Sequence, residues 1–243
     1  HPRDDGGSIL SGIHGASWLV LLAFGVLAGV YALAPSTAHD DHVYHLQAIR
    51  EFSENGSLWQ PSPQLNTYRP LAHAALLAWL RLLAGDVVTG LGNLLFLIAT
   101  GLLMAKTCGL PGTVSLLAWV SNPELVCLAG SSYVEPFQCL VFVAILVLLG
   151  SPGLRFGMST FWVVGLLAGL LPATKYLGLA LLPVAAILAY DLVRRGKIPL
   201  KACSALLAGC LISLCLGAGP FYWRNQVMTG NPRTIGPEAL AES

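Results

Sequence analysis

Long apolar runs recur along this chain, and they constrain its fold more than any other feature of the sequence. A helix that crosses a bilayer needs about 20 mainly apolar residues, and breakers such as Gly and Pro separate most of the runs. Eight runs approach that length: Trp18–Pro35, Pro70–Ala84, Leu91–Lys106, Thr113–Gly130, Tyr133–Leu149, Met158–Thr174, Tyr176–Val193 and Lys201–Tyr222. The sequence therefore predicts an all-α fold, a polytopic membrane bundle of seven or eight hydrophobic helices.

The composition agrees with a membrane protein and argues against some partners. Of 243 residues, 55% are hydrophobic and 10% are charged, whereas soluble domains carry roughly 25% charged residues. With 13 basic and 12 acidic residues, the chain has no basic surplus for a phosphate backbone, so nucleic acid is excluded as a partner. Its six cysteines form no CxxC pair and are interpreted as small hydrophobic residues.

One long polar segment, residues 36–69, interrupts the apolar pattern. A connection of this length in a compact bundle is usually functional. Within it, the spacing of Val43, Leu46, Ile49 and Phe52 predicts an amphipathic helix that lies along the membrane interface and ends at Gly56. The domain organisation that follows is an N-terminal tail (1–16), a transmembrane domain (17–232) with an outer loop (36–69), and a C-terminal tail (233–243).

The positive-inside rule gives an orientation. The connection Arg194–Lys201 carries four basic residues and is expected in the cytoplasm. Alternation along the chain then places Glu135, Lys175 and Arg224 on the opposite face, together with the loop. With the outer loop on that face as well, the number of membrane crossings does not allow every run to be a full crossing. The weakest run, Pro70–Ala84, is therefore expected to be short, re-entrant or broken. We expect a multi-pass protein of a bacterial inner membrane or an equivalent one, with its active face away from the cytoplasm.

The stretch "AHDDHVYH" opens the outer loop and concentrates its polar chemistry. Adjacent carboxylates such as Asp40 and Asp41 tend to split their pKa values, which suits a pair with one base and one cation-binding or orienting group. His42 and His45 are candidate metal ligands, since Asp41 and His45 lie four apart on one face of a helix. The alternative is that an aspartate only caps the interfacial helix.

Three further charged residues lie at the ends of apolar runs on the same predicted face. A charge within a membrane costs about 2.5 to 3.5 kcal/mol on insertion scales, so each needs a reason. Glu135 is either a first-turn acid favoured by the helix dipole or a ligand. Lys175 either extends to the interface or binds an anion. Arg224, within the aromatic stretch "FYWRN", is suited to bidentate binding of a phosphate.

Several stretches taken in order resemble a known family. They are "DDHVYH", "NGSLWQPSP", "YRPLAHAALLAWL", "SNPELVCLAGSSYVEPFQCLVF", "ATKYLGLALLP" and "GPFYWRNQVMTGNP". The order is similar to that in GT-C glycosyltransferases of the protein-mannosyltransferase and aminoarabinose-transferase type, and the resemblance extends from Asp40 to Pro232. It implies an inverting enzyme that transfers a sugar from a polyprenyl-phosphate donor to an acceptor on the outer membrane face.

The resemblance also implies roles for single residues. Asp40 or Asp41 would be the general base that activates the acceptor hydroxyl, and Lys175 and Arg224 would hold the lipid phosphate as it leaves. Glu135 would position the acceptor or a divalent metal ion, which is the one cofactor expected. Further substrate contacts are expected from the loop residues Tyr44 and Arg69. His42 and His45 are not clearly part of the family pattern and remain low-priority metal ligands.

Family members are considerably longer than this chain. A fragment, a split gene product or a relative that kept the fold and lost the chemistry would each explain the difference. The alternative function is therefore a non-catalytic membrane subunit that acts as a scaffold for other membrane protein subunits. A transporter is a third reading, but the charges lie at helix ends on one face and no inverted repeat is evident.

Overall fold

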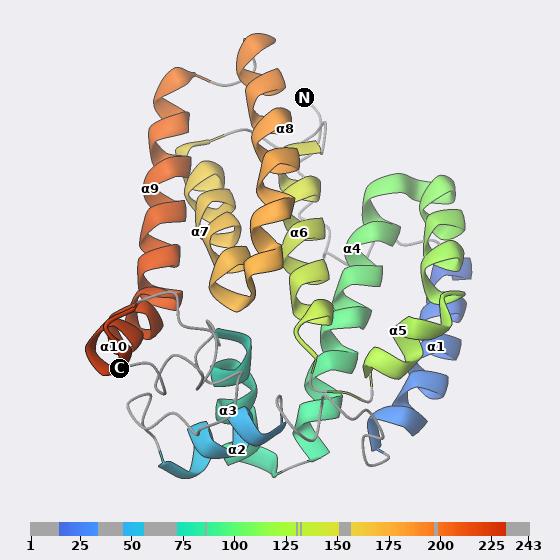
Figure 1. Ribbon diagram of the computed structural model, residues 1–243. Helices are drawn as coiled ribbons and strands as arrows, with labels where there is room; N and C mark the ends of the chain where they lie inside the picture. The colour runs from blue at the N-terminus through green and yellow to red at the C-terminus, as the bar shows by residue number, and fades with distance from the viewer. Residues whose placement is uncertain are drawn as a thin grey trace.

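The computed structural model describes residues 15–33, 46–55, 72–85, 87–129, 131, 133–150, 157–196 and 199–231, and within these residues the fold is all-α, as predicted. The helices are α1 (Gly15–Leu33), α2 (Leu46–Asn55), α3 (Ala72–Ala84), α4 (Val87–Val120), α5 (Pro123–Ala129), α6 (Glu135–Gly150), α7 (Met158–Thr174), the 3₁₀ helix η3 (Tyr176–Leu181), α8 (Leu182–Arg194), α9 (Leu200–Gly217) and α10 (Gly219–Thr229). Figure 1 shows that most of them run up or down one common direction.

Helix α1 packs beside α4, which Figure 1 shows rising, turning over and descending again. Two glycines allow the close approach. A Cβ on Gly90 would lie 2.6 Å from the Ala32 carbonyl oxygen, and one on Gly101 would lie 2.7 Å from the side chain of Leu21. A buried hydrogen bond of 2.7 Å between the hydroxyls of Ser17 and Thr113 joins α1 to the descending part of α4. These contacts make α1 antiparallel to the first part of α4.

Helices α7 and α9 run parallel, and small residues bring their backbones together. A Cβ on Gly165 would lie 2.2 Å from the Leu206 carbonyl oxygen, and one on Gly169 would lie 2.3 Å from that of Cys210. Because no larger side chain fits at these positions, the glycines set the distance between the two helices. Small residues at helix interfaces are typical of packing inside membranes.

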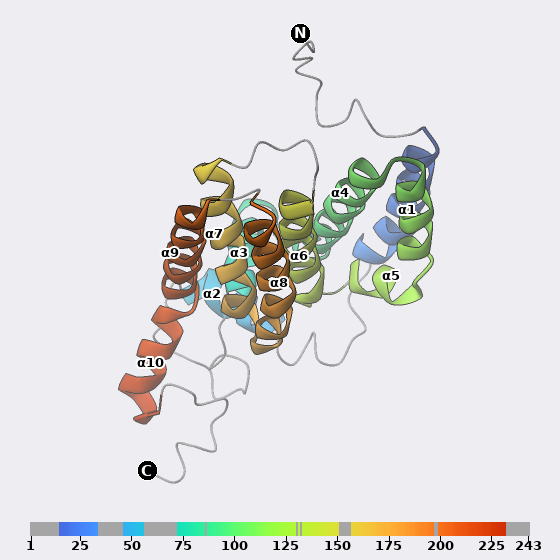
Figure 2. The same cartoon turned by 90° about the horizontal axis from the view of Figure 1, so that it is seen from above.

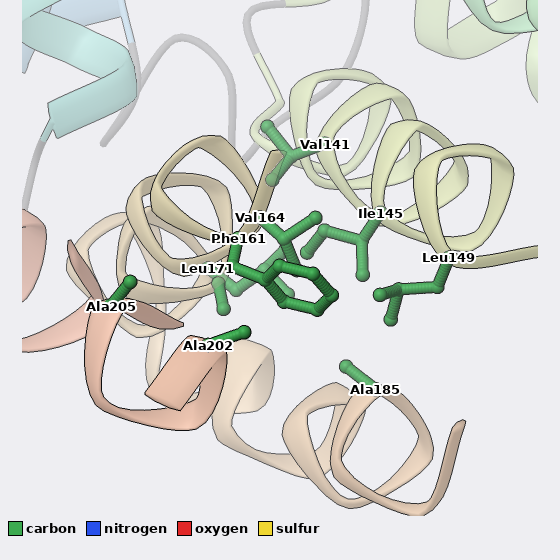
Figure 3. Close-up of a cluster of buried hydrophobic side chains, with 10 residues drawn as sticks. Val141, Ile145, Leu149, Phe161, Val164, Leu171, Ala185, Ala202 and Ala205 are labelled. Carbon is green, nitrogen blue, oxygen red and sulfur yellow. The ribbon is translucent and has the colours of Figure 1, made fainter. Parts of the chain in front are cut away.

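A buried apolar cluster joins α6, α7, α8 and α9, as Figure 3 shows. Phe161 of α7 is 1% exposed and lies at its centre, between Ile145 of α6 and the small side chains of α8 and α9. Truncating a buried phenylalanine of this kind costs about 3 to 5 kcal/mol. This cluster is the largest core of the described chain and holds the four helices as one unit.

Three of the predicted apolar runs are each broken into two helices. The breaks separate α4 from α5, η3 from α8, and α9 from α10, and the first and last of them bend the chain by 71° and 44°. Each second helix carries a proline in its first turn, namely Pro123, Pro183 and Pro220. Proline lacks a backbone N–H and its ring clashes with the preceding turn, so it begins a new helix more readily than it continues one.

Helices α2, α3 and α10 lie beyond the lower ends of α6, α7 and α9 (Figures 1 and 2). The predicted amphipathic helix is present as α2 and ends at Asn55, next to Gly56. Its apolar face, with Ala48 and Ile49 buried, packs against Leu77 of α3. An ion pair of 3.2 Å between Arg81 and Glu54 adds a polar contact between α2 and α3.

No described helix on its own is both long enough and apolar enough to cross a bilayer. Two bent pairs pass that test by length and composition, Gly112–Val120 with Pro123–Ala129 and Lys201–Gly217 with Gly219–Met228.

The two ends of the bundle are named here by one residue each. The Glu135 end is where α6 begins and α7 ends, and the Arg194 end is where α8 ends and α9 begins. Helix α1 also ends at the Glu135 end. Its residue Ala32 lies against Gly90 of α4. Gly90 is one turn before Asn93, whose side chain is hydrogen-bonded to the connection in front of α6. The described helices thus alternate between the two ends, while their crossing of a membrane and the assignment of one end to the cytoplasm stay predictions.

Candidate functional site

The candidate residues of the outer loop lie outside the described residues. They are Asp40, Asp41, His42, Tyr44, His45 and Arg69. Their roles as base, substrate contacts and metal ligands therefore stay predictions. The described candidates are Glu135, Lys175 and Arg224, and all three lie at the Glu135 end.

Glu135 and Lys175 form an ion pair. Lys175 Nζ donates to Glu135 Oε1 at 2.6 Å, and each side chain is about one third exposed. Glu135 is the first residue of α6 and Lys175 directly follows α7. A carboxylate at a helix N-terminus and an ammonium at a helix C-terminus are both stabilised by the helix dipoles. The pair therefore joins two antiparallel helix ends, each with the sign of charge that it favours.

Two buried polar side chains fix the relative position of α6 and α7 beside this pair. Gln138, one turn after Glu135, donates from Nε2 to Thr174 Oγ1 at 2.9 Å and to the Leu171 carbonyl oxygen at 3.3 Å. Thr174, directly before Lys175, donates to the same carbonyl at 2.7 Å. Buried polar groups are costly unless they are hydrogen-bonded, so these contacts favour a single register of the two helices.

A second buried polar cluster holds the connection that leads into α6. Asn93 of α4 is fully buried, and its Nδ2 donates to the carbonyl oxygens of Ser131 at 2.7 Å and Tyr133 at 2.8 Å. Its Oδ1 lies 3.2 Å from Nε2 of His73, a buried residue of α3. The His73 ring in turn lies 5.8 Å from the ring of Phe137 of α6. Elements α3, α4 and α6 thus meet within one turn of Glu135.

Arg224 is 2% exposed and lies within α10. Its guanidinium stands 5.4 Å from the centre of the Phe221 ring and donates from Nη2 to Asn225 Oδ1 at 3.0 Å. Phe221 approaches Phe52 of α2 at 6.4 Å between ring centres. The aromatic stretch "FYWRN" therefore supplies one buried ring, that of Phe221, while Trp223 is 64% exposed.

The structure brings Glu135 and Lys175 into contact and places Arg224 on a separate element at the same end. The link between the two places runs through α9, whose Gly217 packs against Ala173 of α7, close to Ala72 of α3. Within the described part of the chain, no three His, Cys, Asp or Glu side chains gather as metal ligands. A divalent metal ion remains a prediction that depends on the outer loop.

Sequence reasoning considered only charged residues in and beside the apolar runs, and so it missed Asn93, Gln138 and His73 as organising residues. The signal was present, since "GLGNLLF" and "EPFQCLVF" each hold one amide in an apolar helix. An isolated amide in such a run needs a buried partner, for the same reason that a charge does.

In comparisons with protein-family models, curated proteins and solved structures, this chain finds no match.

Proposed function

We propose that this chain is a membrane glycosyltransferase of the GT-C kind, which transfers a sugar from a polyprenyl-phosphate donor to an acceptor on the face away from the cytoplasm. The observation that carries the proposal is the Glu135–Lys175 ion pair at the end of the bundle beyond which α10, the helix of Arg224, also lies. Helix α1 ends there and α3 begins there, against Gly217 of α9. The carboxylates Asp40 and Asp41 belong to the segment between these two helices.

The surface of the bundle supports a membrane location. One face of α1 exposes a row of large apolar side chains at 54 to 70% of their area: Leu19, Leu22, Val26, Leu27, Val30 and Leu33. Ile187 of α8 and Leu216 of α9 are exposed to a similar degree. Water-soluble proteins rarely expose apolar surface so extensively, and lipid is the solvent that suits it. Helices shorter than the hydrocarbon core are accommodated by local thinning of the bilayer.

The reaction needs a base, a leaving-group stabiliser and an oriented donor. In our proposal, Asp40 or Asp41 accepts the proton of the acceptor hydroxyl, and the acceptor oxygen attacks the anomeric carbon with inversion. The bond from that carbon to the phosphate oxygen breaks, and the electron pair leaves with the polyprenyl phosphate. Lys175 and Arg224 stabilise the charge on this phosphate. A divalent metal ion, held by Glu135 or by loop residues such as His42 and His45, would add positive charge there.

A second candidate function is a non-catalytic membrane subunit in a larger complex. The observation that favours it is the state of the two cations. Lys175 is bonded to Glu135, and Arg224 contacts Asn225 and Phe221. Charges satisfied within the protein stabilise a fold without any ligand. In this reading, the exposed apolar faces contact lipid and other membrane subunits.

The two candidates differ in the effect of removing the loop carboxylates. The test uses membranes that contain the chain, a polyprenyl-phosphate donor carrying a labelled sugar, and total cell-envelope acceptors. Whichever of Asp40 and Asp41 is the base, its replacement in Asp40→Asn or Asp41→Asn should lower transfer of the labelled sugar about a hundredfold. The amount of protein in the membranes should not change. The matched control is Asp191→Asn, which alters an aspartate at the Arg194 end and should transfer as well as the unaltered chain.

Transfer that persists in the double variant Asp40→Asn with Asp41→Asn would exclude these residues as the base and contradict the proposed mechanism. An unaltered chain that transfers no sugar and does not bind undecaprenyl phosphate in lipid nanodiscs would overturn the enzyme proposal in favour of the subunit. The binding measurement does not require the acceptor to be known.

A further inference from the structure

We propose that Asn93 is a positioning residue that fixes the connection before α6, and through it the Glu135–Lys175 ion pair, while holding a proton on Nε2 of His73. The inference deepens the proposed function and rests on it for one consequence, the binding of a phosphate at Lys175. The juxtaposition of Asn93, His73 and the carbonyls of Ser131 and Tyr133 is independent of that function.

The orientation of the Asn93 amide follows from its partners. Backbone carbonyl oxygens only accept hydrogen bonds, so the amide group that faces Ser131 O and Tyr133 O must be the NH₂ group, at 2.7 and 2.8 Å. The opposite atom, Oδ1, therefore faces His73 and can only accept. A hydrogen bond at 3.2 Å then requires the proton to be on Nε2 of His73. The geometry thus selects the ring state of a buried histidine.

The hydrogen bonds of Asn93 to Ser131, Tyr133 and His73 are called the clamp below. A short stretch of backbone connects this clamp to the Glu135–Lys175 ion pair. Tyr133, whose carbonyl Asn93 holds, is two residues before Glu135. The following carbonyl, of Val134, accepts from the backbone N–H of Gln138 at 3.0 Å. Gln138 is bonded on its other side to α7 beside Lys175. Asn93 thus holds the start of α6 from the α4 side, and Gln138 holds it from the α7 side.

Burial decides the role of Asn93. Asn93 is 0% exposed, and both ends of its amide are bonded within the protein, to Ser131, Tyr133 and His73, so we assign it no substrate contact. Asn93 therefore acts through Glu135 and Lys175. Loss of its three hydrogen bonds would release the connection before α6 and change the distance between the two charged groups.

The first experiment measures that distance without altering the pair. A carbodiimide joins a carboxylate to an amine in direct contact, and mass spectrometry quantifies the Glu135–Lys175 amide against total peptide. The unaltered chain in nanodiscs should give this product, and Asn93→Leu should lower its yield severalfold. The control is Asn122→Leu, an exposed asparagine whose Oδ1 accepts from the Glu124 backbone N–H, and its yield should not change. An equal yield in Asn93→Leu and the unaltered chain would overturn the inference.

The second experiment makes its main observation on the unaltered chain. Nitrogen-15 spectra of the ring nitrogens in the unaltered chain should show a protonated Nε2 for His73, assigned by its loss in His73→Gln. A deprotonated Nε2 would overturn the inference. The side-chain amide nitrogen of a glutamine lies nearly where Nε2 of the histidine lies, and it also donates a hydrogen bond. His73→Gln should therefore retain the Glu135–Lys175 amide product, whereas His73→Leu should lose it. Equal yields in these two variants would contradict the clamp.

Binding of undecaprenyl phosphate separates this inference from the proposed function. Asn93→Leu should weaken binding about tenfold, the effect of misplacing one hydrogen bond to a charged group. If the unaltered chain does not bind this lipid while the cross-linking and spectra are as expected, the proposed function fails and the clamp stands. If it binds, and Asn93→Leu binds equally well, the positioning role fails.

Discussion

The two ends of the bundle both carry charge, but they hold it differently. At the Arg194 end, the ion pair of Arg195 with Asp191 spans one helical turn, and its side chains are 61% and 38% exposed. Lys106 and Lys201 are exposed at the same end. At the Glu135 end, by contrast, Arg224 is buried, and the ion pair of Glu135 joins two different helices.

This contrast indicates which end is suited to a binding site. A charge on a solvated surface needs no particular partner, whereas one held between packed elements requires several residues to agree in position. Buried amides and histidine organise the Glu135 end, through Asn93, Gln138 and His73. The basic residues of the Arg194 end are those that the sequence predicts to face the cytoplasm, and that assignment stays a prediction. Among the described residues of the two ends, those of the Glu135 end combine charge with contacts between different helices.

The largest effect is expected in the helix pair that supports both ends. Gly165→Ala adds a methyl group 2.2 Å from the Leu206 carbonyl oxygen, so α7 and α9 must separate, and the free energy of unfolding should fall by about 3 kcal/mol. The control is Gly150→Ala, because a Cβ there meets nothing within 4 Å. Denaturant titration followed by circular dichroism in micelles measures both. Equal stability of the two variants would mean that α7 and α9 do not pack as described.

The next effect compares buried and exposed polar bonds at the two ends. Asn93→Ala leaves buried partners without their hydrogen bonds and should lower the free energy of unfolding by about 2 kcal/mol. Ser204→Ala, at the Arg194 end, removes an exposed bond from the hydroxyl to the Lys201 carbonyl oxygen and should change stability by less than about 0.5 kcal/mol. The same titration measures both variants. Similar losses at the two ends would remove the contrast between them.

The smallest effect concerns the two ion pairs. A double-mutant cycle of Glu135→Gln and Lys175→Met should give a coupling energy of about 1 kcal/mol, because the pair is partly shielded and lies at two favourable helix ends. The matching cycle of Asp191→Asn and Arg195→Met should give about 0.3 kcal/mol. Added salt should weaken the second coupling more than the first. A larger coupling at the Arg194 end would reverse the comparison.

The sequence predicted the helical fold and several helices closely, for instance the run Met158–Thr174, which is α7 with the same bounds. Apolar runs between Gly and Pro breakers are a strong local signal, but the signal failed in α4 (Val87–Val120), which joins two runs predicted as separate helices, Leu91–Lys106 and Thr113–Gly130. The proline-induced breaks were missed at Pro123, Pro183 and Pro220. Each proline was present in an apolar run, and its place in a first turn shows that the run contains two helices.

The site was less predictable because it depends on contacts between elements. Glu135 and Lys175 were recognised singly as candidates, but their direct contact required the register of α6 against α7, which Gln138 and Thr174 set. Hydropathy does not encode that register. The positions of Asp40 and Asp41 relative to the pair stay predictions, since they belong to the outer loop.

We have proposed that the Glu135 end binds a polyprenyl phosphate. Photocross-linking with a light-activated analogue of undecaprenyl phosphate in nanodiscs tests this most directly, with the labelled peptides identified by mass spectrometry. We predict labelling of peptides that contain Lys175 or Arg224, and competition by unmodified undecaprenyl phosphate. Labelling confined to peptides around Arg194 and Lys201, or labelling that the unmodified lipid does not reduce, would contradict the account.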